Sequence, residues 1–209
     1  MFVLCLAIIA TVVLGGVFAA ARRGHQIVDI CRRTRLALAT AERQTAAPGS
    51  AAVADLADLL PSSTTLPSTA LPDQRWTTPS QMAAGRDDAA DWVSNLQRDG
   101  FRRGLFRQWA LSGGGTLQAE VLQFPSHGDA LAFQDWVIGG SCTNASDVFA
   151  VAGDPTAVGL RIDWPGGDIS DQVSFVRGSR RYLAGVRMGD APDRDLVLSI
   201  ERDVAGTAR

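Results

Sequence analysis

Residues 2–21, FVLCLAIIATVVLGGVFAAA, contain no charged residue and no proline. A helix over this run rises about 30 Å, which matches the hydrocarbon core of a bilayer. A helix of a soluble protein is rarely apolar on every side over such a length. The sequence therefore predicts a transmembrane anchor at residues 1–24, with residues 2–21 inside the membrane.

A cleaved signal peptide is the alternative interpretation of this run. Ala19, Ala20 and Ala21 would suit a cleavage site, but no Lys or Arg precedes the run, and it is long for the apolar region of a signal peptide. A retained anchor is therefore favoured. Cys5 does not fit a lipoprotein cysteine, because that residue follows the apolar region and Cys5 lies near its start.

The orientation of the anchor is indicated by two signals that disagree. Five arginines follow the apolar run, which by the positive-inside rule places the following chain in the cytoplasm; they are Arg22, Arg23, Arg32, Arg33 and Arg35. The composition of residues 45–79, together with a family resemblance described below, favours an extracytoplasmic domain. We expect the extracytoplasmic orientation and keep a cytoplasmic domain on a reversed anchor as an alternative.

Between the anchor and the expected domain lie two further segments. Residues 25–44 have apolar residues near helical spacing and predict a juxtamembrane helix, as a continuation of the anchor or lying on anionic lipid. Residues 45–79 hold five of the nine prolines, and their Pro/Ser/Thr-rich composition predicts a disordered linker with one short helix around Val53 to Leu60.

Residues 80–209 have the length and patterning of one folded domain. The pattern predicts an α+β fold in which an antiparallel sheet carries packed helices on one face. The expected elements are a helix from Ser80 to about Arg98, a hairpin of Leu105–Leu111 and Thr116–Phe124, a helix that begins at Ser126–Asp129 and ends at Gly139, strands at 147–152 and 158–164, a second hairpin over 172–188 with its turn at Gly178, and a last helix after Pro192.

The composition gives little support for particular partners or cofactors. All twenty basic residues are arginine, and the formal net charge is −2, so nothing predicts nucleic-acid binding. The three cysteines, Cys5, Cys31 and Cys142, have no spacing typical of a metal site or a redox pair. A Cys31–Cys142 disulfide is compatible with an extracytoplasmic domain, although unpaired thiols are the simpler expectation. No cofactor and no metal are expected.

Catalytic chemistry has one weak candidate. The chain has two histidines, and His127 lies in the stretch PSHGDA, beside Ser126 and Asp129. Neighbouring residues at a helix start point in different directions, so these three do not make a catalytic triad by themselves. A hydrolase that uses His127 with a distant partner remains an alternative, and no catalytic residue is assigned.

An arginine-rich strand provides the candidate binding surface. Arg103, Arg107 and Trp109 fall on one face of a strand with period two. If this face were exposed, it could bind an anionic surface such as a lipid head group or a wall polymer.

The stretches DGFRRGLFRQW and VLQFPSHGDALAFQDWV resemble a known group of proteins. They are similar to the extracytoplasmic α/β domains of actinobacterial membrane-anchored proteins and lipoproteins of unknown function. The matching positions are Gly100, Phe101, Gly104, Arg107, Trp109, Phe124, Asp129, Ala130, Ala132 and Phe133. The resemblance implies an extracytoplasmic domain and carries over no catalytic residue.

These observations together predict a single-pass membrane protein. Its extracytoplasmic α+β domain is expected to bind a protein, a lipid or a cell-wall component without catalysis. The expected location is the cell membrane, with residues 2–21 as the part that contacts lipid.

Overall fold

An antiparallel sheet organises the computed structural model, which describes residues 55–61, 68–154, 156–189 and 192–207. The elements, in chain order, are η1 (Leu56–Leu59), β1 (Ser68–Ala70), β2 (Gln74–Trp76), α2 (Pro79–Ala83), α3 (Ala89–Arg98), β3 (Arg103–Leu111), β4 (Thr116–Gln123), α4 (His127–Ser141), β5 (Ala145–Ala150), β6 (Val158–Asp163), β7 (Ile169–Arg177), β8 (Arg180–Met188) and α5 (Arg194–Thr207).

The sheet has eight strands in the described residues: seven follow the order β1-β3-β4-β8-β7-β6-β5, and β2 pairs with β3 beside β1. The two hairpins β3–β4 and β7–β8 were predicted and are confirmed, and β4 joins them by pairing with β8. At one edge, β1 and β2 pair with successive parts of β3, so that Ala70 lies opposite Trp109 and Trp76 opposite Gly104. This edge is therefore built from chain that precedes the expected domain.

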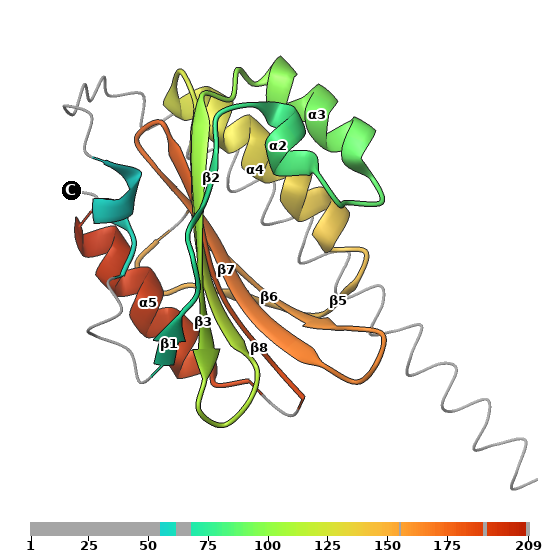
Figure 1. Ribbon diagram of the computed structural model, residues 1–209, viewed down its shortest axis with the longest axis vertical. Coiled ribbons are helices and arrows are strands. Elements are labelled where there is room, and N and C mark those ends of the chain that lie inside the picture. The colour runs from blue at the N-terminus through green and yellow to red at the C-terminus, as the bar shows by residue number, and fades with distance from the viewer. Residues whose placement is uncertain (1–54, 62–67, 155, 190–191, 208–209) are drawn as a thin grey trace, which may run out of the picture.

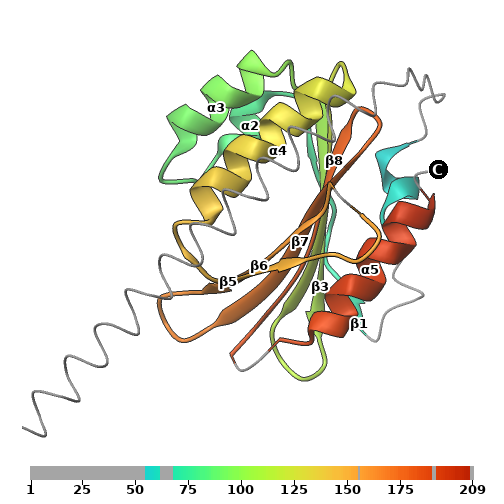
Figure 2. The ribbon, with the colours of Figure 1, turned by 180° about the vertical axis from the view of Figure 1, so that it is seen from behind.

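Helices cover both faces of the sheet (Figures 1 and 2). One face packs against α2, α3 and α4, with Leu96, Phe133 and Leu122 in its core. The other face packs against α5 and η1, with Trp109 and Ile200 in its core. The prediction of helices on a single face is wrong, because successive residues of a strand point to opposite faces and β4 has apolar residues on both: Leu117 belongs to one core and Leu122 to the other.

Part of the predicted linker belongs to the fold. The leucines Leu56, Leu59 and Leu60 are buried against Trp109, and η1, β1 and β2 all lie within residues 45–79. A domain boundary at residue 80 is therefore wrong for residues 55–61 and 68–79. Short strands without an apolar alternation of their own are stabilised here by backbone pairing with β3, which local composition does not reveal.

The expected helix from Ser80 to Arg98 is divided into α2 and α3. Thr78 caps α2 in a capping box with Gln81, and Gly85 between the two helices has φ of 79°. That left-handed conformation ends the first helix, and glycine adopts it without steric cost. Asp88 then precedes α3 and accepts a hydrogen bond of 3.0 Å from the indole of Trp92.

The second half of the domain agrees more closely with the elements predicted from the sequence. The helix α4 begins where it was predicted, and Ser126 caps it by accepting a hydrogen bond from Asp129 N. It continues through Gly139, the predicted end, to Ser141. Cys142 follows at the end of α4 and is disulfide-bonded. Unpaired thiols are thus the wrong expectation for Cys142, and the other two cysteines, Cys5 and Cys31, lie outside the described residues.

The predicted anchor and juxtamembrane helix, residues 1–24 and 25–44, also lie outside the described residues. Within the part of the chain that the structure describes, no helix combines the length and the apolar character needed to cross a bilayer.

Candidate functional site

The arginine-rich strand face is turned toward the interior. Arg103, Arg107 and Trp109 alternate along β3, and Trp109 is 0% exposed beneath η1. Arg103 donates to Gln123 at 2.6 Å within the β3–β4 pair. The condition of an exposed face is not met at Trp109, because the leucines of η1 belong to the same core and cover it. These three residues therefore do not form an open anionic-surface site.

Arg107, on β3, holds residues that precede the predicted domain boundary at residue 80 against the sheet. Its guanidinium donates to both carboxylate oxygens of Asp73, at 2.8 and 2.9 Å, and to the carbonyl of Pro61 at 2.9 Å. The hydrogen bond from Arg107 lowers the pKa of the Asp73 carboxyl below its ordinary 3.8. Arg107 thus has a structural role in fastening the segment that follows η1.

His127 begins α4 and is engaged in local contacts. Its Nδ1 lies 2.8 Å from the carbonyl oxygen of Gly178, in the turn between β7 and β8. The hydroxyl of Ser126 donates to Asp129 Oδ2 at 2.6 Å instead of facing the imidazole. His127, which the hydrolase alternative uses, and its neighbours Ser126 and Asp129 are therefore arranged as a helix cap and a turn contact.

A pocket of about 340 Å³ lies on the face of the sheet that carries α2, α3 and α4, where β2, β3 and β4 meet α2. Strand register builds its floor, because Gln74 pairs with Phe106 and Phe106 pairs with Glu120. Three adjacent strands thus place an amide, an aromatic ring and a carboxylate in one row. We call this the Glu120 pocket; its lining residues are Gln74, Trp76, Gln81, Met82, Ala84, Arg86, Phe106 and Glu120.

The walls of the Glu120 pocket combine rings and polar groups. The rings of Trp76 and Phe106 are tilted by 33° with centroids 6.0 Å apart. Arg86, from the segment after α2, places its guanidinium 3.7 Å from the ring centroid of Trp92. Gln81 uses its Oε1 to accept from Thr77 and Thr78, so this oxygen is already engaged in the helix cap.

Glu120 is the unusual member of the lining, because it is a carboxylate that is only 4% exposed. Arg181 of β8 donates to its Oε1 at 2.6 Å, and the Arg181 side chain is 2% exposed. Burial lowers the pKa of the Arg181 guanidinium, while Glu120 acts in the opposite direction. Replacing such a pair with apolar residues is often neutral or stabilising, so its presence is weak evidence for a purely structural role.

A chain of buried hydrogen bonds continues from Arg181 into α4. Arg181 Nε donates to Ser174 Oγ at 3.1 Å, and Ser174 Oγ donates to Gln134 Oε1 at 3.1 Å. Gln134 in turn donates to the carbonyl of Thr156 at 2.6 Å. These contacts fix Arg181, and therefore Glu120, in one position. The carboxylate at the floor of the pocket is thus held in position by hydrogen bonds among buried residues that do not line the pocket.

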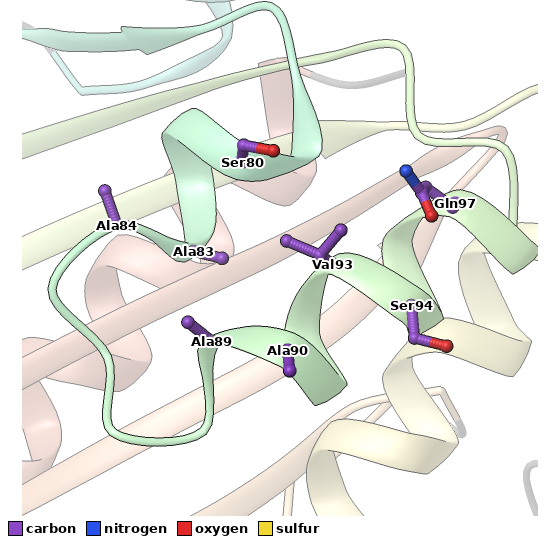
Figure 3. A pocket seen from close by; sticks show the side chains of 8 residues that line it. All are labelled: Ser80, Ala83, Ala84, Ala89, Ala90, Val93, Ser94 and Gln97. Carbon is purple, nitrogen blue, oxygen red and sulfur yellow. The ribbon is translucent and has the colours of Figure 1, made fainter.

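A second pocket of about 450 Å³ lies between α2 and α3, and Figure 3 shows its lining. Most of its lining side chains are small, and none carries a charge; they are Ser80, Ala83, Ala84, Ala89, Ala90, Val93, Ser94 and Gln97. It offers few groups that could orient a ligand. We therefore regard the Glu120 pocket as the candidate functional site.

The Glu120 pocket offers aromatic surface, amide groups, one carboxylate and one guanidinium. Apolar walls with a few polar groups are the usual mixture in small-molecule sites. Among the described residues no group of His, Cys, Asp and Glu side chains has an arrangement that could hold a metal ion. None of the residues that line this pocket was predicted as a site residue from the sequence. A usable signal was Glu120 itself, the one charged residue in the stretch TLQAEVLQF.

Comparisons with solved structures find weak similarity, of which one example follows. The crystal structure of the extracellular domain of PknH from Mycobacterium tuberculosis matches with a TM-score of 0.47 and 14% sequence identity, over 76% of this chain and 100% of that chain. We draw no functional argument from a similarity at this level. No protein-family model matches the chain, and no curated protein is significantly similar in sequence.

Proposed function

We propose that this chain is a single-pass membrane-anchored protein whose domain lies outside the cytoplasm and binds a cell-wall component, without catalysis, in the Glu120 pocket. The observation that carries the proposal is the nearly buried carboxylate of Glu120 at the floor of a pocket with aromatic walls. Burying a charge is costly, and a binding site gives a reason to retain it.

One feature supports the membrane anchor, and another supports the location of the domain outside the cytoplasm. The apolar run at residues 2–21 has the length of a membrane span. Cys142 is disulfide-bonded, and disulfides persist mainly in extracytoplasmic compartments. The arginines after the run predict the opposite orientation, so topology is the first property to test.

A reporter fused after Arg209 of the full-length protein tests the topology. Alkaline phosphatase is active only outside the cytoplasm, whereas a fluorescent protein that folds only in the cytoplasm reports the reverse. We expect phosphatase activity without fluorescence. Fluorescence without phosphatase activity would place the domain in the cytoplasm and overturn the proposed location.

Retention on isolated cell-wall sacculi tests the binding. The full-length protein in detergent is expected to sediment with the sacculi, and Phe106→Ala is expected to weaken retention about tenfold, the effect of losing roughly 1.4 kcal/mol. Phe106 lines the Glu120 pocket, whereas Val93 lines the pocket between α2 and α3, so Val93→Ala is the control. Equal retention of wild type and Phe106→Ala would contradict the assignment of the pocket.

A further inference from the structure

We infer that the ligand of the Glu120 pocket is a neutral sugar ring, such as one N-acetylated hexose of a wall polysaccharide. The inference rests on the proposed function of this pocket and names its ligand class. It follows from three properties of the lining: its balance of charge, its hydrogen-bonding groups and its aromatic walls.

The charges that face the pocket balance one another. Its lining contains one carboxylate, Glu120, and one guanidinium, Arg86. The carboxylate is already paired with Arg181 at 2.6 Å, and the guanidinium is stacked 3.7 Å from the ring centroid of Trp92. Glu120 is the charged group at the floor and disfavours an anion placed against it, while Arg181 and Arg86 weaken its attraction for a cation. A neutral ligand avoids both penalties.

The hydrogen-bonding groups suit hydroxyls. Arg181 occupies Oε1 of Glu120, which leaves Oε2 as the acceptor for a ligand. The Oε1 of Gln81 accepts from Thr77 and Thr78, so Gln81 can offer its amide NH₂ as a donor. Gln74 adds an amide that both donates and accepts. A ligand that matches this mixture must donate and accept at neighbouring positions, as the hydroxyls of a sugar do.

The walls suit the apolar face of a sugar ring. Trp76 and Phe106 present two rings at 33° to each other, and Met82 adds a thioether that is itself 3% exposed. A volume of about 340 Å³ lies at the lower end of the range of small-molecule sites, about 300–1,000 Å³. A cavity of this volume can hold one or two sugar rings and is too small for a folded protein.

Saturation-transfer NMR on the full-length protein, with four matched small molecules, tests the ligand class. The probes are N-acetylglucosamine, which is neutral, glucosamine, which is cationic, glucuronate, which is anionic, and alanine, which is a zwitterion. We expect N-acetylglucosamine to bind and to compete with sacculi, and the other three to bind at least about tenfold more weakly. Tighter binding of any charged probe would overturn the inference.

A change of specificity provides the second test. Gln74→Glu adds a negative charge to the lining and should change the ratio of the affinities for glucosamine and N-acetylglucosamine by about tenfold in favour of glucosamine. Gln97→Glu makes the same substitution in the pocket between α2 and α3 and should leave the ratio unchanged. Both glutamines are exposed, so neither variant depends on repacking of the core. An unchanged ratio in Gln74→Glu would overturn the inference.

The two proposals can fail separately. Retention on sacculi that depends on Phe106 but is not reduced by N-acetylglucosamine would overturn the ligand class and leave the binding function in place. Absence of retention in the wild type, measured in the same preparation, would overturn the proposed function itself.

Discussion

Arg181 donates to Glu120 across 2.6 Å, and the two side chains are 2% and 5% exposed. The pair joins β8 to β4 beneath the pocket floor, where neither charge can be solvated well. Its effect on the fold and its effect on the pocket can be separated by substitution, because the two residues are on different strands and only Glu120 lines the pocket.

Arg181→Met should destabilise the fold strongly. It leaves the Glu120 carboxylate buried without its partner, a change that costs roughly 3–5 kcal/mol in comparable pairs. The double variant Glu120→Leu with Arg181→Met removes both charges and should recover most of that loss. The free energies of unfolding in urea, measured for both variants and the wild type, check the prediction. A double variant no more stable than the single one would contradict it.

Asp73→Asn should reduce the stability of the fold at neutral pH, and the difference from wild type should shrink in acid. The pKa of Asp73 is lowered by its hydrogen bond from Arg107. A carboxyl with a lowered folded-state pKa stabilises the fold above its unfolded pKa, and this stabilisation is lost as the pH falls through the folded value. Urea unfolding from pH 7 to below the ordinary pKa of 3.8 measures the effect. The exposed Asp58 gives the control Asp58→Asn, and a difference for Asp73→Asn that stays constant with pH would refute the prediction.

Gly159→Ala should destabilise the sheet. A methyl group at this position of β6 would collide with the ring of Phe149 on β5, so ring and strand would have to move. Forcing extra volume into a packed region costs about 1–3 kcal/mol. Gly113→Ala is the matched control, since nothing lies within 4 Å of the added methyl and its φ is not in the left-handed region. Similar thermal unfolding midpoints for the two variants would argue against this packing effect.

Cys142 should be linked to Cys31. Cys142 is disulfide-bonded, and the chain offers only Cys5 and Cys31 as partners within itself. Cys5 lies in the apolar run predicted to be within the membrane, so we expect Cys31. Peptide mapping without reductant tests the link, and Cys31→Ser should make Cys142 reactive toward maleimide while Cys5→Ser should not. The opposite pattern would assign the link to Cys5.

The sequence predicted those parts of the fold that depend on local pattern. The alternation of apolar residues in β3, β4, β7 and β8, and the helix start at Ser126–Asp129, depend on a few neighbouring positions and were recognised. The pairing of β1 and β2 with β3 was missed, because it joins residues such as Gln74 and Phe106 through the backbone and leaves no apolar pattern in a Pro/Ser/Thr-rich segment.

The site was missed for a related reason. Arg107 and Trp109 were selected because they share a strand face, yet the sequence does not say what covers that face, and η1 covers it. The Glu120 pocket draws its lining from β2, β3, β4 and the segment around α2. Only the register across three strands brings Gln74, Phe106 and Glu120 into one row.

The attachment of β1 and β2 to the sheet edge limits the reach of the protein from the lipid surface. A tether that ended at residue 79 could extend to about 200 Å at the maximum length per residue. Because Leu56 and the residues after it already pack in the core, the chain between the proposed anchor and residue 55 can extend at most about 110 Å, and the expected Cys31–Cys142 link would shorten this reach further. The Glu120 pocket would therefore sample only the layer of the envelope nearest the bilayer.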